Sequence, residues 1–176
     1  MKSDAPDTLA QFEKAMLPHM NAAYNLARWL MRNESDAEDA VQEAYLRAFR
    51  FFNSFQGGDG RGWLFAIVRN TCRTALQRSG SQPQTAEFQE EIHSYENAHS
   101  ETQMLRQDDI ESVRWCIDRL PAEYREVIVL RELEQMAYKE IAAAIEAPLG
   151  TIMSRLARAR ARLQDCLTMR IPGVRA

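Results

Sequence analysis

The sequence has little glycine or proline, only three cysteines and no long hydrophobic run. Seven Gly and six Pro among 176 residues exclude a collagen-like or low-complexity chain. The longest apolar runs are short, such as residues 127–130, so the sequence predicts neither membrane insertion nor a signal peptide. With 45% hydrophobic residues, the chain can bury the core of one ordinary domain or of two small ones.

The three cysteines, Cys72, Cys116 and Cys166, are far apart along the chain. Their odd number and the absence of a CxxC or Cys/His spacing give no support to a disulfide framework or a zinc site. The sequence therefore predicts a cytoplasmic protein with reduced thiols and with no metal or other cofactor. It leaves open whether any of the three cysteines senses redox state.

Charge is distributed unevenly, although the formal net charge is only −3. Residues 81–112 contain eight acidic residues and the single base Arg106, whereas residues 149–176 contain six arginines and the single acid Asp165. Such asymmetry predicts a C-terminal part that binds a polyanion and a separate acidic segment.

Apolar residues recur at helical spacing along most of the chain, and no segment has a convincing strand pattern. Ser35 and Glu38 stand at the spacing of a capping box, which predicts a helix start there, and residues 56–62 and 79–91 are rich in turn formers. The expected helices cover residues 9–32 with a kink at Pro18, 35–52, 63–78, 109–119, 122–133, 138–145 and 150–163. The sequence predicts an all-α protein.

The last two expected helices are joined by a tight turn at residues 146–148, the arrangement of a helix-turn-helix. The second has an apolar stripe at helical spacing (Ile152, Leu156, Ala159 and Leu163). On its other side are Thr151, Ser154, Arg155, Arg158 and Arg162, whereas Arg160 lies near the edge of the stripe and is expected to form a structural ion pair. A solvated amphipathic hairpin is the alternative to DNA binding. Glu146 occupies the turn position where many helix-turn-helix proteins have Gly, because the backbone there has a positive φ. A non-Gly residue in that conformation costs about 1 kcal/mol.

The expected helix at residues 35–52 has a mixed outer face. Its helical projection buries Val41, Tyr45, Ala48 and Phe52, and it turns Asp39, Gln42, Glu43, Leu46, Arg47 and Arg50 outward. An outward leucine among charged residues is typical of a protein-docking surface. A plain solvated helix with a Glu43–Arg47 pair is the alternative. No histidine stands at ligand spacing from the acids, so a carboxylate-metal enzyme is not supported.

Two long motifs in this order resemble bacterial RNA polymerase sigma factors of the extracytoplasmic-function class. Residues 36–55 and 57–76 are similar to sigma region 2, and residues 120–163 are similar to sigma region 4. The resemblance implies a region 2 domain at residues 1–80, a flexible acidic linker at residues 81–108, and a region 4 helix-turn-helix domain at residues 109–176.

The resemblance also implies roles for individual residues. The outward face of the second helix would bind core RNA polymerase through Asp39, Gln42, Glu43 and Leu46. The −10 element of the promoter would be bound by Asn53, Ser54, Phe55, Gln56, Arg69, Asn70 and Arg73, with Phe55 either walling a flipped base or packing under its loop. The −35 element would be bound by Thr151, Ser154, Arg155, Arg158 and Arg162.

The implied partners are core RNA polymerase, promoter DNA and an anti-sigma factor, and the implied protein is not an enzyme. Met153, Glu146 and Thr74 depart from residues that are frequent in the family, so promoter sequences cannot be transferred to this chain. The main rival is a stand-alone helix-turn-helix regulator, which would bind duplex operator DNA as a dimer without polymerase.

Overall fold

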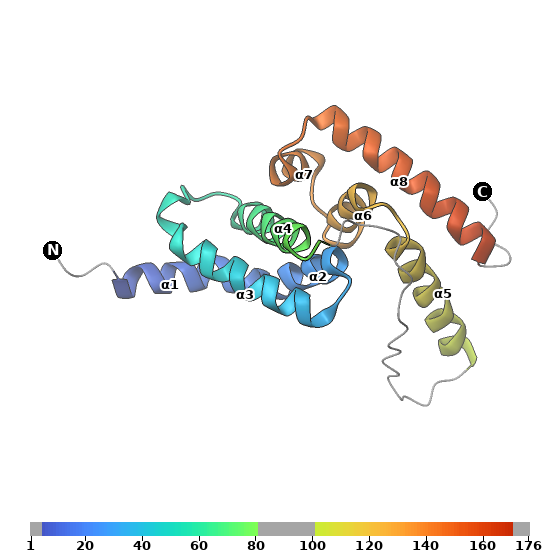
Figure 1. Cartoon of the computed structure of the whole chain (residues 1–176), viewed down its shortest axis with the longest axis horizontal. Helices are drawn as coiled ribbons and strands as arrows, with labels where there is room; N and C mark the ends of the chain where they lie inside the picture. Colours follow the sequence, from blue (N-terminus) through green and yellow to red (C-terminus); the bar gives the residue numbers. More distant parts are fainter. Residues whose placement is uncertain (1–4, 81–100, 171–176) are drawn as a thin grey trace.

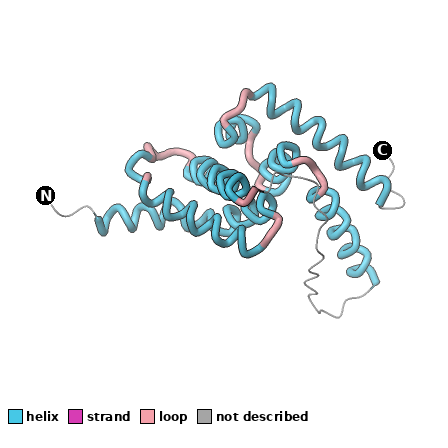
Figure 2. The backbone as a smooth tube through the Cα atoms, viewed as in Figure 1, coloured by secondary structure: helices cyan, strands magenta, loops and turns pink. Residues whose placement is uncertain are grey.

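The computed structural model describes residues 5–80 and 101–170, and every regular element in these two stretches is a helix (Figures 1 and 2). The N-terminal half contains α1 (Ala5–Met16), η1 (Leu17–His19), α2 (Met20–Met31), α3 (Glu34–Arg50), η2 (Phe52–Ser54) and α4 (Gly60–Arg78). The C-terminal half contains α5 (Glu101–Asp118), α6 (Ala122–Ile128), η3 (Val129–Leu133), α7 (Tyr138–Ile145) and α8 (Leu149–Arg170). The predicted all-α class is confirmed.

Residues 101–108, which the sequence assigned to the linker, are helical. Residues 81–100 lie outside the described residues, and α5 begins at Glu101 instead of the expected Asp109. The acidic composition of residues 101–109 concealed a segment that continues the helical pattern of residues 109–119.

The first two helix boundaries of the N-terminal half have local causes. Pro18 falls in the 3₁₀ turn η1 that separates α1 from α2, as its missing N–H predicts. Arg32 then turns the chain with φ of 61°, and the Asn33 side chain accepts a hydrogen bond from the Asp36 N–H at 2.9 Å. The expected capping box at Ser35 and Glu38 is therefore wrong, because Asn33 caps α3 two residues earlier.

Small residues allow α3 to pack closely within the N-terminal half. Its inner face carries Ala37, Ala40, Ala44 and Ala48, each at most 4% exposed. Opposite them, α2 and α4 contribute larger buried side chains such as Leu26, Leu64, Phe65 and Val68. The alternation of small and large groups fills this core and fixes which face of α3 remains in solvent.

Two features shape the connection from α3 to α4. Gly57 and Gly58 have φ values of 82° and 90°, which side chains disfavour. Gly60 begins α4 so close to α1 that an added Cβ would lie 3.4 Å from the Ala15 carbonyl oxygen and from Met16 Cε. The loop is thereby held near the end of α1.

The C-terminal half contains the expected helix-turn-helix. The structure places α7 at residues 138–145 as predicted, and Glu146 has φ of 57°, the left-handed conformation expected there. The Ala147 N–H donates to the Ala142 carbonyl at 3.0 Å and closes the turn. Ile152, Leu156 and Ala159 of α8 are at most 1% exposed and pack toward α6, which confirms the buried stripe.

The two halves contact each other. In Figure 1, α6 and α7 lie beside α2 and α4, and the same element pairs are in contact. Two ion pairs cross the contact: Arg69 with Glu126, and Arg61 with Glu134. Arg61 also donates to the backbone carbonyl of Glu134.

Cys116 of α5 and Cys166 of α8 form a disulfide, with their Cα atoms 5.8 Å apart. The expectation of three reduced thiols is therefore wrong for this pair. Fifty residues separate the two cysteines, so their spacing gave no sign that the packing of α5 on α8 brings them together. Cys72 is free and buried in the N-terminal half.

Candidate functional site

The outward face of α3 is open to solvent. Asp39, Gln42 and Glu43 are exposed, and Leu46 is 65% exposed, which is more than most large apolar side chains of the described residues. Glu43 Oε1 accepts a hydrogen bond from Arg47 Nε at 2.6 Å, so this acid is partly neutralised within the helix. All four expected polymerase-binding residues thus lie on one accessible face, with an unshielded leucine beside carboxylates.

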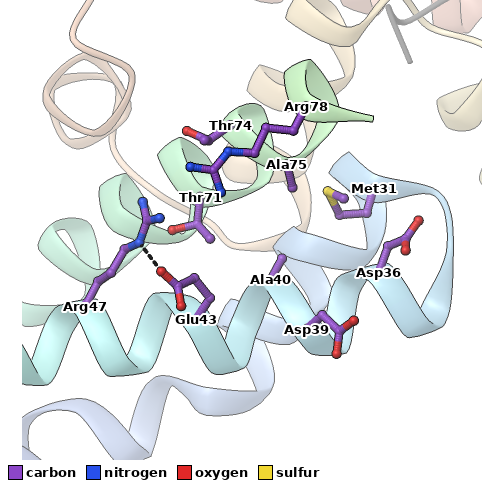
Figure 3. Close-up of a pocket in the computed structure, with 10 residues that line it drawn as sticks. All are labelled: Met31, Asp36, Asp39, Ala40, Glu43, Arg47, Thr71, Thr74, Ala75 and Arg78. Atoms are coloured by element: carbon purple, nitrogen blue, oxygen red, sulfur yellow. Dashed lines mark hydrogen bonds and ion pairs between the residues drawn. The ribbon is translucent and has the colours of Figure 1, made fainter. Parts of the chain in front are cut away.

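An open pocket of about 260 Å³ adjoins this face, between α3 and α4 (Figure 3). Asp39 and Glu43 line it from α3, while Thr71 and Thr74 line it from α4. Figure 3 shows the Arg78 side chain running back along α4 toward Thr74. The pocket therefore offers carboxylates on one wall and a guanidinium on the other, which suits charged and polar side chains of a protein partner.

The loop after α3 presents polar groups around a packed aromatic floor. Asn53, Ser54 and Gln56 are exposed, and Ser54 Oγ donates to the Phe51 carbonyl at 2.6 Å. Phe55 is half-buried, with its ring centroid 5.8 Å from that of Phe52 and 5.2 Å from that of Trp63. Of the two alternatives for Phe55, packing under the loop is the one that these contacts favour.

Phe51 is a candidate that the sequence reasoning missed. It is 56% exposed and directly precedes the polar loop, so it offers the apolar surface that Phe55 does not. The helical spacing that turns Tyr45, Ala48 and Phe52 inward was sufficient to place Phe51 outward.

The expected −10 residues of α4 differ in their accessibility. Asn70 and Arg73 are exposed. Arg69, by contrast, donates from Nε to Glu126 Oε1 at 2.5 Å, with only 14% and 10% of the two side chains exposed. Burial raises the pKa of Glu126, and the neighbouring Arg69 partly offsets that rise. In this arrangement Arg69 is occupied by the other half of the molecule.

On α8, Ser154, Arg158 and Arg162 of the five expected −35 residues are exposed, whereas Thr151 and Arg155 are half-buried. Ser154 and Arg158 are fully on the open side. Arg155 is half-buried and pairs with Glu123 at 3.4 Å, and the Arg162 guanidinium lies 5.2 Å from the centre of the Tyr124 ring. Thr151 is half-buried near the start of the helix. The exposed Met153 (53%) adds an apolar group to the same surface.

Arg160 fastens α8 to the turn before α7. Its Nη2 and Nε atoms donate to Glu132 Oε1 at 2.7 Å and 3.0 Å, and Nη1 reaches the Tyr138 hydroxyl at 3.5 Å. The hydrogen bond with Glu132 raises the pKa of Arg160. The expected structural ion pair of Arg160 is confirmed.

Within residues 5–80 and 101–170, no group of three or more His, Cys, Asp or Glu side chains is placed to hold a metal ion. The same residues include no helix that is both long and apolar enough to cross a membrane.

Two known protein families match the chain, one in each half. The sigma-70 region 2 family matches residues 16–82, and the sigma-70 region 4 family matches residues 110–163. The chain is 30% identical to the RNA polymerase sigma-H factor of Pseudomonas aeruginosa over 89% of its own length and 86% of that protein. It is 34% identical to the ECF RNA polymerase sigma-E factor of Escherichia coli over 74% of the chain and 73% of that protein.

Two solved structures resemble nearly the whole chain. One is the sigma factor RpoE in complex with the anti-sigma factor NepR from Bartonella quintana, with 28% identity and a TM-score of 0.69 over 90% of this chain and 97% of that one. The other is CnrH in complex with the cytosolic domain of CnrY, with 24% identity and a TM-score of 0.62 over 90% of this chain and 88% of that one. The second likeness concerns the fold alone.

Proposed function

The chain belongs to the extracytoplasmic-function class of RNA polymerase sigma factors, and from this premise we propose how its two halves divide promoter recognition. As a member of this class it is a transcription-initiation factor that directs RNA polymerase to promoters, and it is not an enzyme. The proposal concerns which surfaces perform each part of that task.

The N-terminal half, residues 1–80, docks on core polymerase through the outward face of α3. The observation that supports this docking surface most strongly is Leu46, which is 65% exposed and stands about one helical turn after Glu43 and one turn before the exposed Arg50. An apolar side chain that is costly to leave in water and is ringed by charge has the composition of an interface hot spot. Gln42 completes this face, and the adjoining pocket at Thr71 and Thr74 extends it.

The same half captures the −10 element as a single strand. Asn53, Ser54 and Gln56 supply hydrogen-bonding groups around one base, and Phe51 supplies an exposed apolar wall, with Phe55 as the packed floor. Asn70 and Arg73 on α4 contact the sugar-phosphate backbone. Arg69 joins them only when its ion pair with Glu126 opens.

The C-terminal half, which begins with α5, reads the −35 element as a duplex. Ser154 and Arg158 point away from the buried stripe of α8 and enter the major groove, where arginine pairs with guanine edges. Arg155 and Thr151 are half-buried, and the exposed Arg162 lies beside the Tyr124 ring. These three residues contact phosphates, which position the helix without specifying a sequence.

Each half binds DNA weakly by itself. Tethering to polymerase raises the effective concentration of both DNA-binding surfaces at the promoter, and this makes the weak binding sufficient. The protein works in the cytoplasm, where core polymerase and the chromosome are found. An anti-sigma factor that covers the α3 face would switch it off. Support for this partner comes from the similar structure of RpoE, which is a complex with the anti-sigma factor NepR.

Gel filtration with purified core polymerase tests the proposal. The protein should co-elute with core polymerase and should then open promoters in transcription assays. The stand-alone regulator predicts the opposite: a two-fold dimer with stable, sequence-specific binding to duplex operator DNA, no co-elution and no effect on initiation.

A further inference from the structure

The disulfide between Cys116 and Cys166 joins α5 to α8, two helices that also pack on each other. Arg170 near the end of α8 reaches α5, where its guanidinium lies 4.3 Å from the centre of the Trp115 ring and its Nε is 3.3 Å from Ser112 Oγ. Both of these contacts are at the surface. The covalent bond is the strongest link between α5 and the C-terminal part of α8.

The disulfide lies beyond the end of the proposed DNA-binding surface, because Cys166 is one helical turn after Arg162, the last of the proposed −35 residues. Cys166 is eight residues beyond Arg158, which is about 12 Å along the axis of an α-helix. Cys116 is 1% exposed and faces the interior of the domain. A change at this pair would therefore alter how firmly the domain holds together without altering the groups that read bases.

Disulfides are rare in the cytoplasm, and those that occur there are usually transient, either catalytic or redox-sensing. Resting on the proposed function, which places the protein beside polymerase and DNA in that compartment, we infer that Cys116 and Cys166 form a reversible redox switch that sets the stability of the −35-binding domain.

The two cysteines differ in access, which assigns their roles. Cys166 is half-buried on α8, whereas Cys116 is almost fully covered. Cys166 therefore meets the oxidant and Cys116 resolves the product. With a hydroperoxide, the Cys166 thiolate attacks the O–O bond, gives a sulfenic acid and releases the alcohol or water. The Cys116 thiol then attacks Cys166 Sγ and releases water.

The sum is two thiols and one hydroperoxide giving one disulfide, one alcohol (or water) and one water. In the reverse direction, a glutathione thiolate attacks the more accessible Cys166 Sγ, and Cys116 leaves as the thiol. A second glutathione then resolves the mixed disulfide and leaves as glutathione disulfide. Two electrons are transferred in each direction.

The pair closes a loop of fifty residues that spans α6, α7 and most of α8. Cross-linking a loop of this length restricts the unfolded chain and so favours the folded domain. The oxidised C-terminal half should melt at least about 10 °C above the reduced one. Oxidised protein should consequently retain transcription from −35-dependent promoters at temperatures that silence reduced protein.

Cys72 provides an internal control. Burial raises the pKa of its thiol to about 12, so almost none of it is thiolate near neutral pH. Oxidation of the other two cysteines should leave Cys72 intact. Cys72→Ser should lower each free-thiol count by one, but it should change neither the midpoint of the redox titration nor the difference in melting temperature between the oxidised and reduced proteins.

The test uses the full chain, equilibrated in a series of glutathione buffers from fully reduced to fully oxidised. Maleimide-polyethylene glycol labelling under denaturing conditions counts free thiols, and circular dichroism gives the melting curve of each state. The inference predicts a reversible fall from three thiols to one, with the midpoint inside the buffer series and higher melting when oxidised. Cys116→Ser, Cys166→Ser and the double variant should each melt like reduced protein under all buffers.

Three results would overturn the inference: a pair that stays reduced throughout, a pair that stays oxidised in the most reducing buffer, or melting curves that coincide within 1–2 °C, about the shift from a minor surface change. Because oxidised and reduced proteins share one sequence, a poorly folding variant cannot hide the outcome. A parallel transcription assay separates this question from the proposed function. If neither the oxidised nor the reduced protein supports initiation, the proposed function is wrong. The thiol counts and melting curves still test the redox switch in that case.

Discussion

The two halves of the molecule leave different surfaces open. In the N-terminal half, the face of α3 is fully exposed, but Arg69 on α4 is engaged by Glu126 from the other half. In the C-terminal half, Ser154 and Arg158 are exposed, while Arg160 and Arg155 brace α8 from its sides. The proposed protein-docking surface and the proposed duplex-reading surface are thus exposed, whereas Arg69 of the proposed single-strand surface is engaged in an ion pair.

This difference explains why such a factor can depend on polymerase. The proposed docking through α3 uses residues that are already exposed, whereas access of DNA to Arg69 requires its ion pair with Glu126 to open. A partner that separates the halves would complete the −10 surface at the time when DNA is delivered.

The largest expected effect is at the α3 face. Leu46→Ala combined with Glu43→Lys should weaken binding to core polymerase by about 30-fold or more, the equivalent of about 2 kcal/mol, because the change removes a hot spot and reverses a charge. Fluorescence anisotropy with labelled protein measures the affinity. Circular dichroism should show unchanged helical content.

The matched control for this variant is Leu9→Ala with Glu13→Lys on α1. These residues are also exposed and are also separated by about one helical turn. Equal affinities for the two double variants would show that α3 is not the docking surface.

The second largest effect is expected on α8, where Arg158 and Arg162 should differ in their contribution to promoter recognition. Arg158→Ala should lose about 1–3 kcal/mol at one −35 base pair, or about 5- to 150-fold in promoter activity, and should relax preference there. Arg162→Ala should weaken all promoters alike and reduce the salt dependence of binding. Transcription from a −35 point-mutant library distinguishes the two. A base-specific defect in Arg162→Ala with a uniform one in Arg158→Ala would mean that α8 is rotated from the proposed orientation.

A smaller effect is expected at the contact between the halves. Burial raises the pKa of Glu126, so the folded protein holds a proton on this carboxyl more tightly than the unfolded chain does. The resulting stabilisation of the folded state is fully present below the ordinary carboxyl pKa near 4.5 and is lost as the pH rises through the raised pKa. Glu126→Gln stays neutral at every pH. It should therefore melt at a higher temperature than the parent protein at pH 7–8, and the difference should fall to zero as the pH is lowered below 4.5.

Melting curves from pH 4 to 8 check this expectation, with Glu123→Gln as the control, because Glu123 pairs with Arg155 but is exposed. A variant that is less stable than the parent at pH 8 would mean that the attraction of Arg69 outweighs the cost of burying Glu126.

The smallest effect is at Arg160. Its ion pair with Glu132 is about half exposed, so Arg160→Ala should cost about 0.5–1 kcal/mol and lower the melting temperature of its domain by a few degrees. Promoter preference in the −35 library should be unchanged. A double-mutant cycle with Glu132→Ala isolates the contribution of the ion pair to stability. If the effects of the two changes on the melting temperature are additive, the pair does not stabilise the domain.

Local patterns predicted the parts of the fold that depend on local causes. The bounds of α7, the left-handed Glu146 and the buried stripe at Ile152 and Leu156 follow from helical periodicity and turn chemistry. The cap at Asn33 was missed because Ser35 and Glu38 offered an equally good local motif, and only the turn at Arg32 decides between them.

Features that depend on packing between distant segments could not be predicted. Arg125 and Glu126 are 3% and 7% exposed, although charged residues usually lie at the surface. The pairing of Glu126 with Arg69 requires the docking of one half on the other, and the hydrogen bond from Arg125 to the Asp118 carbonyl requires α6 to pack beside the end of α5. The disulfide requires α5 to pack on α8, and the packed position of Phe55 requires Trp63 from the next helix.

The most direct test of the central claim is in vitro transcription by core polymerase on fragments of the source genome, with and without the protein, followed by mapping of start sites. The protein should confer initiation at a limited set of promoters that share −10 and −35 elements, and the Leu46→Ala, Glu43→Lys variant should abolish it. Start sites that are identical with and without the protein, together with stable binding of the protein alone to duplex sites, would contradict the account.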